Sequence, residues 1–482
     1  MPDRRFALTA VVVLALVASG CRGDDPAAIS GSGPGQGEDS REGTADVSPT
    51  TIALAPTVPP PAASPTCPTP PAANQPDPRR PRYRLSVDVR LDENTVRGVT
   101  EVRFTPDIDT DRLVFRLWAN GPRPAASGGS IQTGAVTVNG RPAPSSVEDP
   151  TTLVVRPTPA PAANRAVDIS VPWTLHLPGP SRDRMAREGD SVRLGSFFPI
   201  LPWEPGVGWG LEPATGGFAE ASVAPVADFE MTVTVPAGFA ALASGREDRP
   251  GHWTATAVRD VALSVGRFTT ATGTAHAPEA VEVKVGVVQG IGESPEPYLA
   301  KTIAVMNDFG RRFGPYPWPT FTLAITPGVG GGIEYPTHVM QGPGTIGATT
   351  SHEVAHQWFY ALVGNNQGRD PWLDEGLASW GEARFEDALS AFLAEPIPPG
   401  ATGRLGDPMT YWSGRQALYF RGVYVQGVHA LAALGSPDLV DCALRVYAAA
   451  FAHRIARPGD LVAALRSAFP DAESVLERYG VR

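Results

Sequence analysis

Cysteine is scarce in this chain of 482 residues, which contains only Cys21, Cys67 and Cys442. None of the three has a second cysteine nearby or at the spacing of a metal site, so a zinc site built from thiolates is excluded. Cys67 and Cys442 could form one disulfide in an oxidising compartment. Their unrelated positions favour two unpaired thiols.

Long runs of lysine and arginine are also missing. The formal net charge is −10, and a nucleic-acid groove normally presents a basic patch, so nucleic acid is not an expected partner. Proline and glycine contribute 51 residues each, but no collagen-like period is present. The uneven distribution of proline indicates a disordered segment instead.

The first twenty residues predict an export signal. Arg4 and Arg5 precede an apolar run, FALTAVVVLALVASG, which is too short to span a bilayer and ends in small residues. Cys21 follows, as in bacterial lipoprotein signals, in which this cysteine is acylated; Ala18 stands where leucine is usual. We therefore expect an exported lipoprotein on the outer face of a bacterial membrane, or otherwise a secreted protein with an unmodified thiol.

The composition changes along the chain. Residues 21–80 are rich in proline and alanine and cannot bury enough apolar surface to offset their ordering entropy, which predicts a disordered tether. Between residues 81 and 290, alternating segments such as YRLSVDVRLD and DFEMTVTVP predict an all-β sandwich or saddle domain. From residue 291 to residue 482, helical spacing prevails. The predicted fold class is therefore α+β, with a mainly helical second domain.

A metal-site pattern lies in SHEVAHQWF, which starts at Ser351. His352 and His356 would lie one turn apart on a helix, although a buried helix can also carry incidental histidines. Glu375, 18 residues further on, completes a ligand set of two histidines and one glutamate with a position open for water. We therefore predict one Zn²⁺ per chain, and Glu353 as the base that takes a proton from water.

At this point a family resemblance is visible. HEVAHQWFYALVGNNQGRDPWLDEGLASW resembles the active-site segment of the aminopeptidase N family of gluzincins, in which HExxH is followed after eighteen residues by glutamate in a W-L-[ND]-E-G context. The preceding G-x-M-E-N motif reads here Gly331-Gly332-Ile333-Glu334-Tyr335. The resemblance implies a thermolysin-like catalytic domain. It also implies that Glu334 binds the α-amine of a peptide and that Gly331 and Gly332 line the substrate cleft.

Two more residues are candidates for the site. GVYVQGVHAL resembles a V-Y-x-K-G-like segment whose tyrosine stabilises an oxyanion, which implies that role for Tyr424; Tyr411 and Tyr419 are nearby alternatives. Gln426 replaces the basic residue of that segment. Glu382, two turns after the third ligand, either accepts a hydrogen bond from a zinc-binding histidine or is a solvated surface residue.

Three functions remain open. The favoured one is an exported zinc aminopeptidase acting on peptides with free N-termini, because an endopeptidase gains nothing from an amine anchor such as Glu334. The second is another zinc hydrolase of the same fold, either an endopeptidase or an epoxide hydrolase of the leukotriene-hydrolase type. The third is a non-catalytic binding lipoprotein. Only 58 residues follow Tyr424, too few for the helical C-terminal domain common in the family, which implies a more open site that accepts longer peptides.

Overall fold

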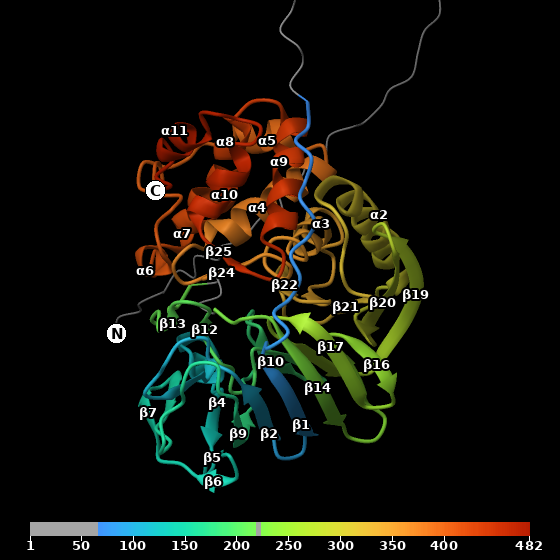
Figure 1. The fold of residues 1–482 in the computed structure, drawn as a ribbon. Coiled ribbons are helices and arrows are strands. Elements are labelled where there is room, and N and C mark those ends of the chain that lie inside the picture. Colours follow the sequence, from blue (N-terminus) through green and yellow to red (C-terminus); the bar gives the residue numbers. More distant parts are fainter. Residues whose placement is uncertain (1–65, 218–222) are drawn as a thin grey trace, which may run out of the picture. The chain divides into compact units, whose positions relative to one another are not determined.

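The structure is a computed structural model that describes residues 66–217 and 223–482. The predicted signal peptide, Cys21 and the first part of the predicted tether lie outside these residues. Within the described ranges, no helix is both long and apolar enough to cross a bilayer. Strands dominate as far as residue 290 and helices follow (Figure 1), so the predicted α+β order is confirmed.

The largest sheet has nine strands in the order β16-β17-β14-β1-β2-β9-β5-β6, with β4 also paired to β9. In β1 every second residue from Tyr83 to Val89 is buried, as the alternation in the sequence predicts. On β2, a Cβ atom at Gly98 would lie 2.2 Å from the Trp173 indole, so the close packing of this ring requires glycine. The strands are β1 (Arg82–Arg90), β2 (Thr95–Phe104), β4 (Ser130–Thr133), β5 (Thr137–Val138), β6 (Arg141–Pro142), β9 (Val167–His176), β14 (Ala227–Thr234), β16 (Arg246–Arg249) and β17 (His252–Val258).

Smaller sheets complete the β-rich region, in the orders β10-β11-β18-β15, β3-β8-β7 and β12-β13. The ring of Phe198 contacts those of Tyr83 and Phe229, with centroids 6.1 and 5.9 Å apart, so the segment SFFPILPW packs on the large sheet. The strands are β3 (Leu113–Arg116), β7 (Ser145–Asp149), β8 (Thr152–Val155), β10 (Met185–Glu188), β11 (Ser191–Gly195), β12 (Trp203–Glu204), β13 (Gly208–Trp209), β15 (Ala240–Ala243) and β18 (Ala262–Gly266).

A five-stranded sheet in the order β19-β20-β21-β23-β22 carries the site. Helix α2 (Pro295–Phe313) packs on β19 and β20. Among the described residues, β22 has a paired strand on one side only, so its other edge is open to a further strand. The strands are β19 (Phe268–His276), β20 (Ala280–Val288), β21 (Thr320–Ile325), β22 (Gly332–Tyr335) and β23 (His338–Gln341).

Helix α4 contacts both α3 and α8. This arrangement places the segment HEVAH beside the segment LDEG. The elements are η1 (Trp118–Asn120), α1 (Pro122–Ala126), α3 (Ala348–Ala355), α4 (Trp372–Phe385), α5 (Leu389–Ala394), α6 (Met409–Trp412), α7 (Gln416–Tyr419), η2 (Phe420–Val425), α8 (Gln426–Ala432), α9 (Pro437–Ala450), α10 (Pro458–Leu465) and α11 (Ala472–Glu477), with the short strands β24 (Gly364–Asn365) and β25 (Ile455–Ala456).

The predicted domain boundary near residue 290 falls between β20 and α2. Strands β19 and β20 precede that boundary in the sequence, yet they belong to the sheet that carries the site, in which β20 pairs with β21. The described residues from 66 onward form one compact unit. The division into a β domain over 81–290 and a catalytic domain over 291–482 therefore stays a prediction.

The last part of the predicted tether, residues 66–80, forms no helix or strand but is fixed to α9. Cys67 forms a disulfide with Cys442 on α9, with Cα atoms 5.4 Å apart. The prediction of two unpaired thiols is therefore wrong; no local pattern connects residues that lie 375 positions apart. Asn74 donates two hydrogen bonds, at 3.0 and 2.6 Å, to carbonyls at the C-terminal end of the same helix.

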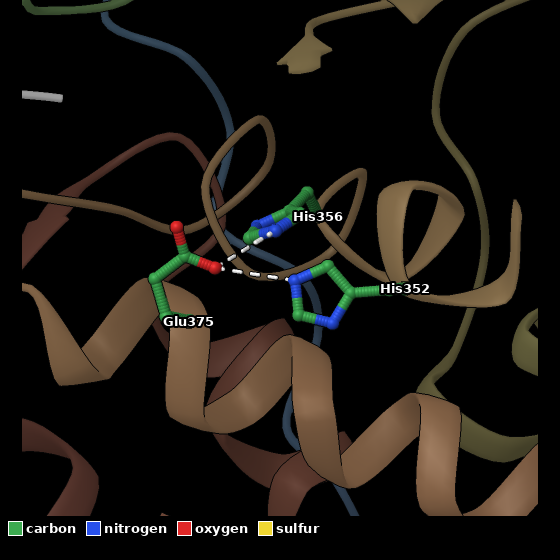
Figure 2. Close-up of side chains that lie close together, drawn as sticks. All are labelled: His352, His356 and Glu375. Carbon is green, nitrogen blue, oxygen red and sulfur yellow. Dashed lines mark hydrogen bonds and ion pairs between the residues drawn. The ribbon is translucent and has the colours of Figure 1, made fainter. Parts of the chain in front are cut away.

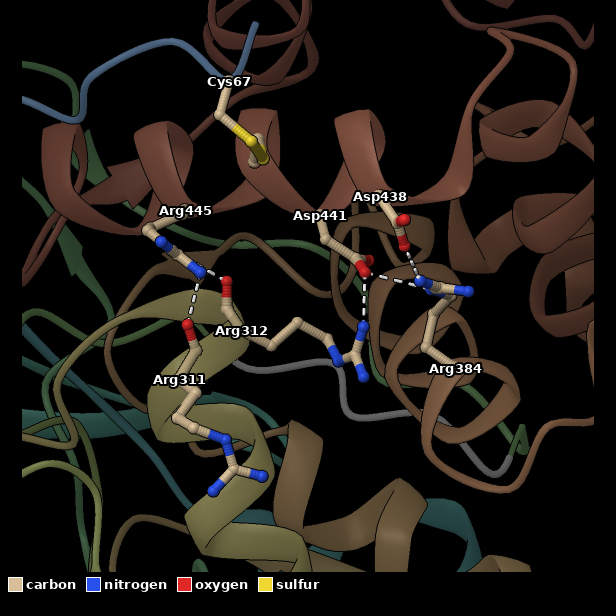
Figure 3. The surroundings of a disulfide bond; sticks show 8 residues. Cys67, Arg311, Arg312, Arg384, Asp438, Asp441 and Arg445 are labelled. Atoms are coloured by element: carbon tan, nitrogen blue, oxygen red, sulfur yellow. Dashed lines mark hydrogen bonds and ion pairs between the residues drawn. A yellow bond between two sulfur atoms is a disulfide. The ribbon is translucent and has the colours of Figure 1, made fainter.

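Helix α9, which receives the disulfide, is itself joined to α2 and α4 by ion pairs (Figure 3). Asp441 lies 2.5 Å from a guanidinium nitrogen of Arg312 on α2 and 3.0 Å from one of Arg384 on α4. Arg445, one turn further along α9, donates to the carbonyl of Arg312 at 2.9 Å. Asp441 is buried, so salt screens these pairs only weakly. The disulfide therefore connects residues 66–80 to a helix that two others hold.

Replacing Cys442 with serine is expected to lower the free energy of unfolding by about 2–4 kcal/mol, because the cross-link no longer restricts the unfolded chain. Residues 66–80 should also become more sensitive to protease, since before Arg79 and Arg80, which bond to Asn164 and Asp228, only the hydrogen bonds of Asn74 still hold them. Urea unfolding and limited proteolysis measure the two effects. Reduction of the unaltered protein should reproduce both, and an unchanged urea midpoint with unchanged cleavage would contradict the prediction.

Candidate active site

The three predicted metal ligands come together from two helices (Figure 2). His352 lies on α3, His356 follows at its C-terminal end, and Glu375 lies in the first turn of α4. Oε2 of Glu375 is 3.2 Å from Nε2 of His352 and 3.4 Å from Nε2 of His356. The three ligand atoms lie within 4.8 Å of one another, and all three side chains are buried.

These three atoms suit a zinc ion in both kind and spacing. Two ligand atoms bound at about 2.05 Å to a tetrahedral zinc are about 3.3 Å apart, and the two separations here are 3.2 and 3.4 Å. Two imidazole nitrogens and one carboxylate oxygen are a donor set that catalytic zinc sites use, with one position left open. His352, His356 and Glu375 could therefore hold one Zn²⁺.

Each of the two histidines has a carboxylate at its other ring nitrogen. Glu382 Oε2 lies 3.1 Å from Nδ1 of His352, and Asp374 Oδ1 lies 2.6 Å from Nδ1 of His356. Gln367 donates to the other oxygen of Asp374 at 2.6 Å. A carboxylate at Nδ1 favours a proton there, which leaves the Nε2 lone pair for a metal. Glu382 therefore lies where it can orient His352.

Glu353, the predicted base, lies buried against strand β22. A Cβ atom at Gly332 would lie 2.3–2.5 Å from the Glu353 side chain, so glycine at this position lets the carboxylate approach the strand. Oε2 of Glu353 has no hydrogen-bond partner among the described residues. Burial raises the pKa of Glu353 to about 7, although the two nearby imidazoles oppose the shift. A carboxylate with a raised pKa and a free oxygen suits a general base.

Glu334 projects from β22 towards the same centre. Single oxygens of Glu334 and Glu353 and a ring nitrogen of His356 lie within 4.8 Å of one another. Oε1 of Glu334 is buried without a hydrogen-bond partner among the described residues, and burial raises the pKa of this side chain to about 8. At Gly331 a Cβ atom would meet nothing within 4 Å, so the strand is open there. A cationic amine would satisfy the unpaired oxygen of Glu334.

Tyr424 comes from the short π-helix η2. Its ring stacks on that of His352, with centroids 5.4 Å apart and planes at 12°. Burial raises the pKa of Tyr424 well above its usual value, and the charge of Glu375 adds to the shift, so the hydroxyl keeps its proton. Segments of π-helix occur frequently at functional sites. Tyr424 therefore presents a hydrogen-bond donor beside a predicted metal ligand.

The alternative tyrosines are placed differently. The hydroxyl of Tyr411 donates to the carbonyl of Gly400 at 2.7 Å, so it is already engaged. Tyr419 is buried, its ring centroid lies 5.7 Å from that of Tyr424, and its hydroxyl has no partner among the described residues. Of the three, Tyr424 is the one whose ring stacks on a predicted zinc ligand.

Gln426, which stands where the resembling segment has a basic residue, bonds to the protein's own backbone. The amide of Gln426 donates to two backbone carbonyls at 3.0 and 2.9 Å and accepts from a backbone N–H at 2.9 Å. Gly427 lets α8 approach α4, since a Cβ atom there would lie 2.6 Å from the Cα atom of Gly376. The Gln426 side chain therefore holds neighbouring backbone segments in place and brings no charge to the site.

Residues 339–396 match the family model for the peptidase family M1 domain. This stretch contains the three predicted ligands together with Glu353 and Glu382. In this stretch the chain is similar to M1 peptidases. Among curated proteins, the aminopeptidase B of Rattus norvegicus and that of Homo sapiens are each 32% identical to this chain over 102 residues. The aligned part is 20% of this chain and 16% of theirs, so the chain spans about a sixth of the length of these relatives.

Solved structures resemble this chain over more of its length. The M1 zinc metallopeptidase from Deinococcus radiodurans covers 85% of this chain and 96% of its own, with a TM-score of 0.61 and 18% identity. A two-domain M1 zinc metallopeptidase bound to L-arginine covers 85% and 95%, with a TM-score of 0.62 and 18% identity. A Deinococcus radiodurans variant bound to a Tyr-Ser-Ala substrate covers 84% and 95%, with a TM-score of 0.61 and 20% identity. At these identities the likeness shows the fold alone.

Asp374 is a residue of the candidate site that the sequence patterns do not reveal. Its carboxylate bridges Nδ1 of His356 and the amide of Gln367. The available signal was an acidic residue directly before Glu375 at the start of a helix. That signal is weak, because acidic residues are common in the first turn of any helix. Gln367 gives no signal at all, since it reaches the site from the loop before α4.

Replacing Glu382 with glutamine is expected to weaken zinc binding by about 10- to 100-fold, because the amide no longer favours a proton on Nδ1 of His352. Competition with a chelator of known affinity measures the change. A matched variant, Glu473→Gln at an exposed position of helix α11, should bind zinc like the unaltered protein. Equal affinities for the Glu382 and Glu473 variants would contradict the prediction.

Proposed function

We propose that the protein is a zinc-dependent aminopeptidase, which removes the first residue from peptides that have a free N-terminus. The observation that carries the proposal is the position of Glu334. Its buried, unpaired carboxylate oxygen lies on an open edge strand beside Glu353 and His356. A carboxylate in that place selects a positively charged α-amine and sets the distance from the amine to the first peptide bond.

The open edge of β22 provides a second means of orientation. An extended peptide can pair with an edge strand through main-chain hydrogen bonds. With its amine at Glu334, such a peptide would pass Gly332 and then Gly331. At Gly331 nothing lies within 4 Å of a Cβ atom, which leaves room for the peptide backbone, whereas the space at Gly332 is taken by Glu353.

The remaining residues supply the chemistry. A Zn²⁺ held by His352, His356 and Glu375 would polarise the peptide carbonyl and lower the pKa of water. Glu353 takes the proton from the attacking water and passes it to the leaving amine. Tyr424 donates a hydrogen bond to the oxygen on which negative charge develops, for which its protonated hydroxyl is suited.

The relatives support this substrate class. Aminopeptidase B is named for the removal of N-terminal residues, and it is 32% identical to this chain over 102 residues. The structural neighbours include complexes with L-arginine and with a Tyr-Ser-Ala substrate, both of which present a free α-amine. The other two functions, a zinc hydrolase of different specificity and a non-catalytic binding protein, are outcomes of the test below.

An exported location is part of the proposal. The disulfide between Cys67 and Cys442 supports it, since disulfides persist mainly in oxidising compartments. The export signal and lipidation at Cys21 rest on the sequence, because both lie outside the described residues. Mass spectrometry of Cys21 in membrane fractions would test lipidation.

The test of the proposed function is hydrolysis of a peptide panel supplied with free and with acetylated N-termini. The proposal predicts cleavage of the free-amine set alone, and loss of cleavage after zinc is removed by a chelator. Cleavage of both sets would overturn the aminopeptidase function in favour of an endopeptidase. No cleavage of either set, with zinc bound, would favour a different hydrolase or a binding role.

A further inference from the structure

The substrate side of β22 continues beyond the amine anchor into a glycine loop. Glu334 projects towards the metal centre, and two residues earlier Gly332 faces the carboxylate of Glu353. Two residues earlier again lies Gly330, just before the strand begins. Gly330 and Gly331 precede the strand, so at about 3.3 Å per residue Gly330 is at most about 13 Å from Glu334 along this edge. That limit corresponds to three or four residues of an extended peptide.

Arg182 covers the far end of this edge. A Cβ atom built at Gly330 would lie 3.5 Å from Cδ of Arg182, 3.6 Å from Nε and 3.7 Å from Cζ. The side chain of Arg182 is exposed, and it has no hydrogen bond or ion pair with any other residue in the described ranges. A guanidinium therefore lies at the glycine loop with its donors available.

Hydrogen bonds from Arg193 hold the backbone on both sides of Arg182. Arg193, which is buried, donates to the carbonyls of Ser181 at 2.6 Å and Asp183 at 3.3 Å and also to that of Pro327. These bonds join the segment before β10 to the loop that leads into β22. The carboxylate of Asp183 pairs with Arg123 at 2.8 Å. The acidic group next to Arg182 in sequence is therefore engaged with another arginine.

Charges of opposite sign lie at the two ends of the β22 edge. Carboxylates, with Glu334 foremost, gather where the α-amine of a peptide would lie, and a free guanidinium lies some three residues downstream. A peptide with a positive amine and a carboxylate at that distance would complement both ends. Arginine suits this role because its planar donors match a carboxylate.

We propose that Arg182 is a specificity-determining residue that binds a substrate carboxylate two or three residues beyond the scissile bond. The inference rests on the proposed aminopeptidase function, since the amine at Glu334 sets the direction of the peptide. The carboxylate can be the C-terminus of a tri- or tetrapeptide or the side chain of an acidic residue in a longer peptide. Both sources present the same group to Arg182.

The test compares kcat/KM for pairs of peptides that differ only in this charge. One pair is a tetrapeptide as the free acid and as the C-terminal amide; the other is a pentapeptide amide with glutamate or glutamine at position three. For an exposed ion pair, the unaltered protein should prefer the charged member of at least one pair by about three- to tenfold. In Arg182→Met that ratio should fall to about one, and it should shrink with added salt in the unaltered protein.

Arg165→Met is the matched control, because Arg165 is exposed on a loop of the β-rich region before β9. It should keep the preference of the unaltered protein. A preference for the free acid alone assigns the carboxylate to the C-terminus of short peptides, and one for glutamate alone assigns it to a side chain. Equal rates within both pairs in the unaltered protein, or a preference that survives in Arg182→Met, would overturn the proposal.

A binding measurement separates this inference from the proposed function. In a Glu353→Gln background, calorimetry would give Kd for the same four peptides without turnover. Tighter binding of the charged members that disappears on Arg182→Met would support the carboxylate site even if no peptide is cleaved. Cleavage of free-amine peptides with no such difference in Kd or kcat/KM would leave the aminopeptidase function standing and overturn the role of Arg182.

Discussion

Replacing Glu353 with glutamine should lower kcat for a free-amine peptide by about 10³- to 10⁴-fold. The glutamine has the same shape but cannot take a proton from water or return one to the leaving amine. Its neighbours His352 and His356 remain, and with them the zinc ligands. The bound zinc should therefore stay at one ion per chain. Steady-state kinetics together with metal analysis of the same sample measure both quantities.

The control for the Glu353 variant is Glu473→Gln on α11, which carries the same chemical change at an exposed position. It should keep kcat and zinc content. A Glu353→Gln protein that holds zinc and retains kcat within tenfold would show that another group moves the proton. Loss of zinc from the same variant would assign Glu353 to metal binding instead.

Replacing Arg259 with methionine is expected to lower the free energy of unfolding by about 3–5 kcal/mol, the largest stability effect that we predict. Arg259 is buried, and its guanidinium donates to the carbonyls of Tyr360 at 2.8 Å, Ala224 at 3.1 Å and Leu362 at 3.3 Å and also to that of Arg454. Methionine fills similar space but leaves these carbonyls buried without a donor. Burial also lowers the pKa of Arg259, to about 10, which still leaves it charged at neutral pH.

Urea unfolding of the Arg259 variant measures the loss. The stability of Arg259→Lys should fall between that of the unaltered protein and that of Arg259→Met, because one ammonium group cannot reach all the acceptors. The exposed control Arg165→Met should leave the urea midpoint unchanged. The Arg259→Met substitution should also affect the candidate zinc site, since Tyr360 and Leu362 follow shortly after the HEVAH segment. Zinc affinity is therefore expected to fall together with the free energy of unfolding. A loss below about 1 kcal/mol, within the range of ordinary surface substitutions, would contradict the prediction.

The meeting of His352 and His356 could be predicted because the information is local. The two are four residues apart, which one helical turn places on one face. The alternation in β1 likewise reports the buried face of a strand directly. The approach of Glu375 depends on how α4 packs on α3, and it could be predicted only from the resemblance of the whole segment to a known pattern.

The features that could not be predicted depend on contacts between distant segments. Cys67 lies in a proline-rich stretch with no periodic pattern, and its partner is on a helix 375 residues away. Arg182 and Gly330 meet only because Arg193 joins two loops. Asp374 was visible in the sequence, but its contact with His356 depends on how α4 packs on α3. The roles of Glu334, Glu353 and Tyr424 in catalysis stay predictions until the variants are measured.

The disulfide between Cys67 and Cys442 also fixes an order of events during synthesis. The first cysteine is made 375 residues before the second, which at about 5–20 residues per second is an interval of about 20–75 s. During that time Cys67 is a free thiol, open to mispairing with other thiols. Residues 66–80 can be locked only after α9 has emerged and folded. The cross-link of this N-terminal segment thus marks a polypeptide that has been completed through α9.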